Sequence, residues 1–503
     1  MKNWNAIVLA TGLGCFISPA LLFAQGSTQP DLKIDWSKTT FESKSTPTLQ
    51  VVVNPMLLRG SKMHDGSFAA LKMLGAEYVR YVPWLPYPKQ AVAELEPPTK
   101  EKTSWEFKYI DPALEDFMKA TEGHSVVMNF STMPAWLWKT DKPVGYPEDP
   151  NQVFWNYTQG TELRDPTMKE AAEYYARLLS WYEKGGLTDE NGKWHESGHH
   201  YKFAYWEVLN EVDIEHHWAP EAYTKFYDVV TSEMLKVDPD IRFMAVASAY
   251  PRMHGSMYEY FLNLRNHVPG THLDFLSYHF YASPSESEPF EAMQYTFFDQ
   301  ADGFLATARY VEQMKHRLAP NMKTDLNELG VILPEDAKSN RIQVYKAKPE
   351  PEGYWNLAGA MYAYLYIEAA KLGIDVVGES QLVGYPTQYP SVSMMNYNTT
   401  EPNPRFWVLK LLKDNFGPGD HLVETAERNR DLAVQAFSTS KGKKLLVINK
   451  RSTSLELELP TNALATSKSY VAPSTKDGEP AIKTLHGANV QLEPFEVAVV
   501  QVK

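Results

Sequence analysis

The 503-residue sequence contains a single cysteine, Cys15. One thiol excludes a disulfide within the chain and any metal site built from several cysteine ligands. Cys15 also lies in an apolar N-terminal segment, Ala6–Ala24, that we expect to be removed from the mature protein. A thiolate nucleophile is therefore excluded from the chemistry of the mature chain.

Long basic segments are also lacking. The chain has 49 Lys and Arg against 62 Asp and Glu, for a formal net charge of −13, and no basic run is long enough to follow a phosphate backbone. Nucleic acid is thus a poor candidate partner, and a neutral or weakly charged ligand fits better. Internal repeats and low-complexity tracts are absent too, so the sequence has the composition of an ordinary globular protein.

The N-terminus has the features of a secretory signal peptide. A short basic start precedes the apolar run Ala6–Ala24, which Pro19 interrupts, and a polar stretch follows. We predict that residues 1–24 are a signal peptide cleaved near Ala24. The mature protein would then be secreted or periplasmic, without stable membrane insertion. An uncleaved membrane anchor is the alternative, and the proline and glycines within the run count against it.

Eight apolar runs typical of β-strands alternate with amphipathic helical stretches, which is the pattern of a parallel sheet. The runs are Leu49–Met56, Tyr78–Val82, Ser125–Phe130, Phe203–Leu209, Arg242–Ala247, Leu273–Tyr281, Thr324–Val331 and Ile374–Val377. Eight strands with intervening helices favour a (β/α)8 TIM barrel over an open, doubly wound sheet. Three long connecting segments could wall a cleft for a polymer or block one end of it for terminal sugars: Lys139–Asp165, Ser283–Asp299 and Leu333–Glu352.

From about His421 the sequence changes to short β-rich runs separated by turn residues. This change indicates an antiparallel β-sandwich of roughly eighty residues. The predicted fold class is therefore α/β: a (β/α)8 barrel at 48–418 with a C-terminal antiparallel β-sandwich domain at 419–503. In the preceding segment, 25–47, the stretch Leu32–Phe41 could add an edge strand to the sandwich.

Two glutamates follow apolar strand runs, at the strand ends where the active sites of (β/α)8 barrels lie. Glu211 comes just after the fourth run and Glu328 lies within the seventh, and each directly follows an asparagine. One such glutamate is more often a cap or an ion-pair partner. Two on one barrel rim favour glycosidic bond cleavage, in which an acid protonates the leaving oxygen and, for retention, a second carboxylate about 5–5.5 Å away attacks the anomeric carbon.

With these motifs, the sequence resembles clan A of the glycoside hydrolases and is most similar to family 39, the group of β-xylosidases and iduronidases. The segments Trp206–Asp213 and Asp274–Tyr281 and the terminal β-rich region carry the resemblance, which covers nearly the whole mature chain. Two features differ from the family pattern: Val212 stands where a proline is common, and the nucleophile segment lacks the usual Thr-Glu form. The resemblance implies that Glu211 is the acid/base and Glu328 the nucleophile of a double displacement.

The resemblance implies roles for four further residues. Asn210 would bind the 2-hydroxyl of the sugar, and Arg80 would keep the nucleophile ionised by charge-assisted hydrogen bonding. His279 and Tyr281, at the end of the sixth run, would orient the nucleophile or contact the sugar. A hydrogen-bonded core histidine is the alternative interpretation of His279.

Aromatic residues make up 13% of the chain. Their flat faces fill protein cores, and they also stack on the C–H faces of sugar rings. Trp84, Trp136 and Trp138, which follow the second and third runs, are candidates for stacking, with core packing as the alternative. Glu379, after the eighth run, is the second candidate for the nucleophile, or else a third carboxylate that binds substrate.

We predict no metal and no cofactor. The pairs His199-His200 and His216-His217 resemble ligand pairs, but adjacent residues point apart on a strand, and neither pair has a partner at metal spacing. The predicted function is a secreted retaining glycoside hydrolase whose partner is a polysaccharide or oligosaccharide. Two alternatives stay open: a hydrolase of algal galactans of the agar or carrageenan type, and a non-catalytic carbohydrate-binding barrel. The intact pair of glutamates argues against the second.

Overall fold

The computed structural model describes residues 32–158, 160–339, 350–384 and 389–503. The predicted signal peptide, 1–24, lies outside these residues. Within the ranges that are described, we find no helix with the length and apolar character needed to cross a membrane.

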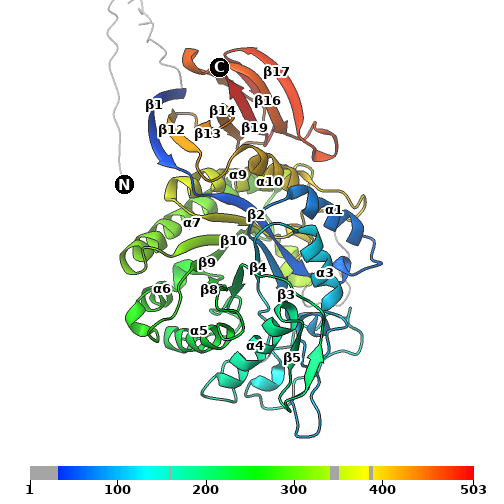
Figure 1. The fold of residues 1–503 in the computed structure, drawn as a ribbon. Coiled ribbons are helices and arrows are strands. Elements are labelled where there is room, and N and C mark those ends of the chain that lie inside the picture. The colour runs from blue at the N-terminus through cyan, green and yellow to red at the C-terminus, as the bar shows by residue number, and fades with distance from the viewer. Residues whose placement is uncertain (1–31, 159, 340–349, 385–388) are drawn as a thin grey trace, which may run out of the picture.

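Eight parallel strands close into a barrel (Figure 1). They are β2 (Thr46–Val53), β3 (Val79–Pro83), β4 (Val126–Met128), β7 (Tyr205–Glu207), β8 (Arg242–Ser248), β9 (Phe275–Ala282), β10 (Lys323–Val331) and β11 (Val376–Glu379). Each strand pairs with the next one in the barrel, and β11 pairs with β2 to close the ring. All eight predicted runs overlap a barrel strand, so the predicted (β/α)8 barrel is confirmed.

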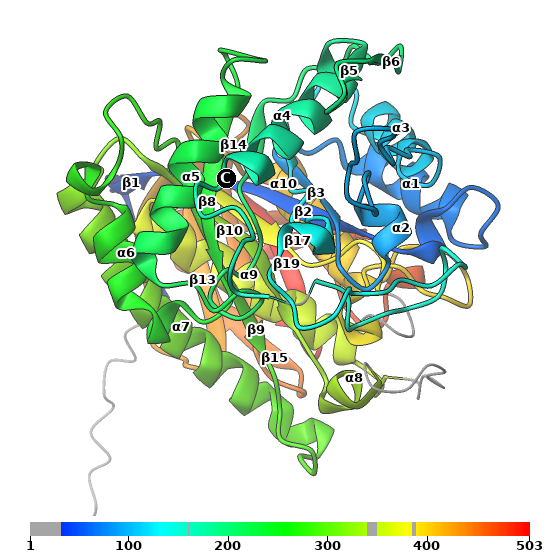
Figure 2. The same cartoon turned by 90° about the horizontal axis from the view of Figure 1, so that it is seen from below.

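Helices cover the outside of the barrel, and Figure 2 shows α5, α6 and α7 following one another along one side. The long helices are α1 (His64–Leu74), α3 (Asp111–Ala120), α4 (Lys169–Glu183), α5 (Pro220–Met234), α6 (Gly255–Phe261), α7 (Phe290–Leu318), α9 (Tyr354–Leu372) and α10 (Pro404–Asn415). Two helices are shorter, α2 (Pro88–Ala91) and α8 (Pro334–Ser339). The predicted connecting segment Ser283–Asp299 is partly helical, because α7 begins at Phe290.

A second layer of β-structure lies beside α9 and α10 (Figure 1). Its main sheet has seven antiparallel strands in the order β1 (Leu32–Glu42), β12 (His421–Glu427), β13 (Leu432–Thr439), β14 (Gly442–Asn449), β19 (Val497–Val502), β16 (Ala465–Val471) and β17 (Ala481–Gly487). The first strand, from the segment before the barrel, pairs with β12 at the sheet edge. The antiparallel C-terminal region of the predicted fold is therefore present, and the limits 48–418 and 419–503 stay predictions.

One face of this sheet packs on the barrel helices and the other on a two-stranded ribbon, β15 (Leu455–Glu458) and β18 (Asn489–Leu492). Leu457 and Val490 of the ribbon share an apolar cluster with Val434 and Val447 of the sheet. Helix α9 is apolar around most of its circumference because it contacts both the barrel strands and β14 and β19. A small hairpin, β5 (Gly186–Thr188) and β6 (Trp194–Glu196), lies between α4 and β7.

Candidate active site

A cavity of about 870 Å³ opens at the C-terminal ends of the barrel strands. Side chains that follow or end different strands line it, as expected for a (β/α)8 barrel. Six of the residues singled out in the sequence are among its lining residues: Trp84, Asn210, Glu211, His279, Tyr281 and Glu328. The barrel thus brings together residues that lie up to 244 positions apart in the chain.

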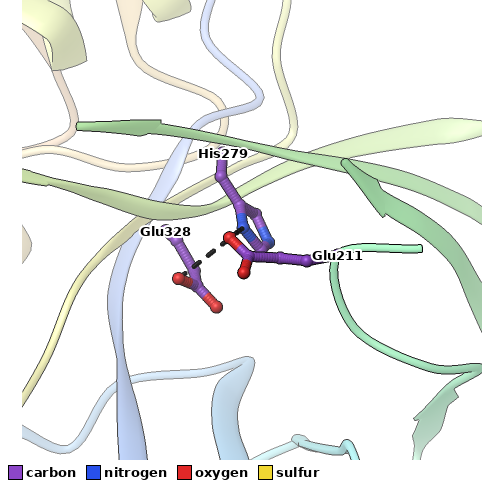
Figure 3. Close-up of side chains that lie close together, drawn as sticks. All are labelled: Glu211, His279 and Glu328. Carbon is purple, nitrogen blue, oxygen red and sulfur yellow. Dashed lines mark hydrogen bonds and ion pairs between the residues drawn. The ribbon is translucent and has the colours of Figure 1, made fainter. Parts of the chain in front are cut away.

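Glu211 and Glu328 face one another below the imidazole of His279 (Figure 3). His279 Nδ1 is 3.1 Å from Glu211 Oε1 and 3.6 Å from Glu328 Oε2, and these three groups can place one atom each within 4.8 Å of the others. His279 and Glu328 are register partners on β9 and β10, while Glu211 follows β7. The two carboxylates are therefore close enough to act on a single bond from two directions.

Glu328 is held by donors at both of its oxygens. Arg80 Nη1 donates to Oε1 at 2.5 Å, and the Tyr281 hydroxyl donates to Oε2 at 2.6 Å. Burial alone would raise the pKa of Glu328, but the charges of His279 and Arg80, with these hydrogen bonds, lower it below the ordinary value. Glu328 is thus ionised at neutral pH, as a nucleophile must be.

The Tyr281 hydroxyl is itself fixed by a short chain of hydrogen bonds. It lies 2.6 Å from both Glu328 Oε2 and Ser380 Oγ. Because the carboxylate can only accept and the phenol has one proton, Tyr281 donates to Glu328 and accepts from Ser380. Gln50 Nε2 in turn donates to Ser380 Oγ at 2.6 Å. A Cβ at Gly330 would lie 3.0 Å from the Tyr281 ring, so a larger residue there would have to displace the ring by a few tenths of an ångström.

Arg80 connects Glu328 to the polar interior of the barrel. Its side chain is 1% exposed, and besides Glu328 it donates to Glu207 through Nε, to Asn210 through Nη2 and to Gln50 through Nη1. Glu207, on β7, also accepts hydrogen bonds from Ser277, Asn129 and Asn327. The buried charge of Arg80 is therefore paired with two carboxylates, and its guanidinium is fixed in one orientation.

Glu211 has different surroundings. Among the described residues its side chain meets one hydrogen-bond partner, His279, and burial raises the pKa of Glu211 above its ordinary value, although His279 opposes the shift. A raised pKa keeps this carboxyl protonated to a higher pH than Glu328. The pKa values of the two carboxyl groups are therefore shifted in opposite directions, which is the kind of difference that an acid and a nucleophilic carboxylate of a retaining glycosidase need.

The backbone around Glu211 is strained. Leu209 and Glu211 have φ values of 65° and 41°, and Val246 and Ala247 on the adjacent strand have 82° and 43°. The two segments are joined where the amide of Glu211 donates to the carbonyl of Ala247 at 2.9 Å. Positive φ is costly for non-glycine residues, above all for a β-branched valine, and such strain gathers at functional sites.

Beside Glu211 the cavity contains a third carboxylate that we did not single out from the sequence. Glu215 Oε1 accepts hydrogen bonds from Trp84 Nε1 at 2.7 Å and Asn210 Nδ2 at 2.9 Å. Burial, together with the charge of Glu211, raises the pKa of Glu215 to about 8. Glu215 follows Glu211 by four residues in the same loop, where no strand run or motif singles it out in the sequence.

Aromatic rings form one wall of the cavity. The Trp84 ring lies 5.4 Å from that of Trp155 and 6.2 Å from that of Tyr389, and all three residues line the cavity. Trp84 was expected near the site, whereas the other two come from long loops without any periodic pattern. We name the group Trp84, Trp155 and Tyr389 the aromatic wall.

The other predicted tryptophans do not line the cavity. Trp138 is 3% exposed and stacks on the buried His216 at 4.5 Å, so core packing is correct for it. The guanidinium of Arg164 lies 4.3 Å from the Trp136 ring, whose Nε1 donates to the carbonyl of Glu94. We therefore drop both from the candidates for ring stacking.

Glu379 also lies away from the cavity, in contrast to its predicted role at the substrate. It is fully buried, and Oε1 accepts a hydrogen bond of 2.8 Å from Arg405 Nε. The same guanidinium donates to the carbonyls of Ser380 and Val392. Glu379 thus fixes the backbone beneath Ser380 and is not placed to attack a ligand.

The side chains of Glu211, His279 and Glu328 are also of the types that bind divalent metals. Arg80 and Tyr281 already bind the oxygens of Glu328, however, and a metal beside the Arg80 guanidinium would face its charge. In the part of the chain that is described, the histidine pairs His199-His200 and His216-His217 do not join this group. These contacts fit a group of side chains that exchange protons better than they fit a metal site.

No protein-family model matches the sequence, and no curated protein matches it. Solved structures do share its fold. A glycoside hydrolase family 30 (GH30) endoxylanase from Clostridium papyrosolvens C71 aligns with a TM-score of 0.58 at 14% identity, over 94% of this chain and 100% of that one. A GH51 arabinofuranosidase from Xanthomonas axonopodis pv. citri aligns with a TM-score of 0.62 at 11% identity, over 94% and 99%. A GH51 α-L-arabinofuranosidase from Thermotoga petrophila RKU-1 gives 0.59 at 14% identity.

At such low identity these similarities establish the fold, a barrel with an accessory β region, over almost the entire chain. Neither GH30 nor GH51 is the family 39 that the sequence motifs resemble. Membership of family 39 therefore stays a prediction.

Proposed function

We propose that this protein is a retaining glycoside hydrolase in which Glu328 is the nucleophile and Glu211 the acid/base. The observation that carries the proposal is the pair itself: two carboxylates whose atoms approach within 4.8 Å at the C-terminal end of a barrel, with pKa values displaced in opposite directions. The solved proteins of the same fold named above are an endoxylanase and arabinofuranosidases, which supports a carbohydrate substrate.

The first half of the reaction forms a covalent intermediate. Ionised Glu328 attacks the anomeric carbon, the bond from that carbon to the leaving oxygen breaks, and Glu211 gives its proton to this oxygen. In the second half, Glu211 removes a proton from water, the water oxygen bonds to the anomeric carbon, and Glu328 leaves. The sum is the addition of one water molecule across the glycosidic bond, with retention of configuration.

Three residues position these groups. Arg80 and Tyr281 keep Glu328 ionised and oriented before substrate arrives, which lowers the reorganisation needed during the reaction. His279 contacts both glutamates, which raise its pKa against the effect of burial, and this shift favours a charged imidazole that stabilises ionised Glu328. Asn210, fixed by Arg80, is positioned to contact the sugar ring.

Stereochemistry tests the proposal. The purified protein is screened with aryl glycosides and plant and algal polysaccharides, and the product first formed from a cleaved substrate is followed by proton NMR. We expect the anomeric configuration of the substrate to be retained in that product, before mutarotation. Initial inversion would exclude Glu328 as a nucleophile, and binding of glycosides without turnover would favour the carbohydrate-binding alternative.

We further propose export of the protein, on the basis of the basic, apolar and polar succession within residues 1–30. N-terminal sequencing of the protein recovered from cells should give a chain that starts close to residue 25. Recovery of the intact N-terminus in a membrane fraction would support the uncleaved anchor instead.

A further inference from the structure

Glu215 has a location in the cavity that the double displacement does not explain. Its amide donates to the carbonyl of Glu211 at 2.8 Å, which ties the two residues together, and its side chain is hydrogen-bonded to Trp84 and Asn210. Its side chain lies between Asn210 and the aromatic wall. Hydrogen bonds thus run without a break from Glu328 through Arg80 and Asn210 to Glu215.

The two oxygens of Glu215 have different tasks. Trp84 Nε1 and Asn210 Nδ2 both donate to Oε1, and no hydrogen bond between described residues reaches Oε2. With the proton on Oε2, the carboxyl group offers an O–H donor to the cavity while its other oxygen stays satisfied. A carboxyl group at the surface of a binding cavity, fixed by two donors, is preorganised for a ligand oxygen.

The charges around the cavity limit the kind of ligand. Its acidic lining residues are Glu211, Glu215, Asp299 and Glu328. Its cationic lining residues are His279, which is engaged by the catalytic pair, and Arg252, which is exposed. A sugar carboxylate or sulfate beside Glu215 would therefore share the cavity with the ionised Glu328 and find no free buried cation to compensate its charge.

We propose that Glu215 is a specificity-determining residue that binds a hydroxyl group of an uncharged sugar ring lying against the aromatic wall. The inference rests on the proposed glycosidase function and deepens it. With Glu215 in this role, the cavity is expected to bind neutral sugars in preference to uronic acids and sulfated galactans.

The first experiment tests the charge of the substrate. Wild-type protein is assayed with aryl glycosides that include matched pairs, such as glucoside and glucuronide of the same anomeric configuration. We expect an uncharged glycoside as the best substrate, with kcat/KM higher than that of any uronide by at least about 100-fold. A uronide as the best substrate would overturn the inference and leave the glycosidase proposal intact. Hydrolysis of no glycoside at all would count against the glycosidase proposal itself.

The second experiment locates the hydroxyl. The best glycoside and its series of monodeoxy analogues are assayed with wild type, Glu215→Ala and Glu215→Gln, and with Glu221→Ala on the exposed surface of α5 as the control. We expect Glu215→Ala to lower kcat/KM for the full sugar on the order of 10- to 100-fold, because Trp84 and Asn210 lose their acceptor as well. Glu215→Gln keeps an acceptor and a donor in place, and it should lose about threefold.

The analogues separate recognition from a structural role. For the one analogue that lacks the recognised hydroxyl, wild type and Glu215→Ala should differ least, since the interaction is already gone. If Glu215→Ala loses the same factor with every analogue, the residue supports the fold of the site and does not read the sugar. If it loses nothing with the full sugar, Glu215 does not contact the substrate.

Discussion

Glu328 and Glu379 each pair with a buried arginine, and their other surroundings differ. Glu328 meets Arg80, Tyr281 and His279 at the cavity, and its pKa is lowered. Among the described residues, Glu379 is hydrogen-bonded to Arg405 only, away from the cavity, and burial raises its pKa to about 7. An ion pair with arginine therefore does not by itself make an active carboxylate. In our account, the number of hydrogen-bond donors around the carboxylate and its access to the cavity determine whether it can react with a substrate.

The largest expected contrast comes from the same substitution at the two sites. Glu328→Gln should lower kcat on the order of 10⁴- to 10⁶-fold, because the covalent step loses its nucleophile. Glu379→Gln should change kcat/KM less than about tenfold, since its side chain acts only through the backbone of Ser380. Steady-state kinetics on one glycoside measures both. Equal losses would remove the distinction between the two pairs.

The second largest effect on kcat/KM is expected from substitution of Glu211, the proposed acid/base. Glu211→Gln should lower kcat/KM about 10²- to 10⁴-fold for a substrate whose leaving group needs a proton. The loss should be smaller for a dinitrophenyl glycoside, which leaves without one. Added azide should restore turnover of that substrate and give a glycosyl azide of retained configuration. A loss that is independent of the leaving group would assign Glu211 another role.

The donors around Glu328 can be removed one at a time. Tyr281→Phe deletes the hydrogen bond to Oε2 and should lower kcat/KM about 10- to 100-fold. It should also move the acid limb of the pH profile upward. The ionised form of Glu328 is the active one, so activity is lost as pH falls through its pKa, and loss of a donor raises that pKa. An unchanged acid limb would mean that Tyr281 does not stabilise the ionised form.

The Glu379 pair should reveal itself in stability. Glu379→Gln leaves the buried Arg405 without its ionic partner, and we expect the free energy of unfolding to fall by about 3–5 kcal/mol. Chemical denaturation monitored by tryptophan fluorescence measures the change. A variant as stable as wild type would show that the hydrogen bond from Arg405 is retained by the amide.

Metal removal should have the smallest effect. Dialysis against EDTA is expected to leave kcat/KM unchanged. In the proposed pair, the Arg80 guanidinium binds Glu328 and a proton neutralises Glu211, so neither carboxyl group needs a metal ion. Restoration of lost activity by zinc or another divalent ion would assign Glu211, His279 and Glu328 as metal ligands.

The sequence predicts the barrel well because each buried strand must be an apolar run, whatever its neighbours are. It predicts Glu211 and Glu328 because both follow such runs, but Glu379 follows one too. Only the closed barrel shows that the Glu379 side chain meets Arg405 and not the cavity. The sequence also could not show that Trp138 packs in the core, since the ring that stacks on it belongs to His216, 78 residues along the chain.

Residues on loops were the least predictable. Trp155 and Tyr389 reach the aromatic wall from segments that have no hydrophobic period, and Glu215 lies in a loop whose path depends on positive φ values at Leu209 and Glu211. Long-range hydrogen bonds and strained backbone depend on the tertiary fold, so no local sequence pattern predicts them.

The most direct test of the account is to trap the covalent intermediate. The protein is incubated with an activated 2-deoxy-2-fluoro glycoside of its preferred sugar, digested, and the labelled peptide sequenced by mass spectrometry. We predict one sugar per chain, attached as an ester to Glu328. A label on Glu211 or Glu379 would contradict the account.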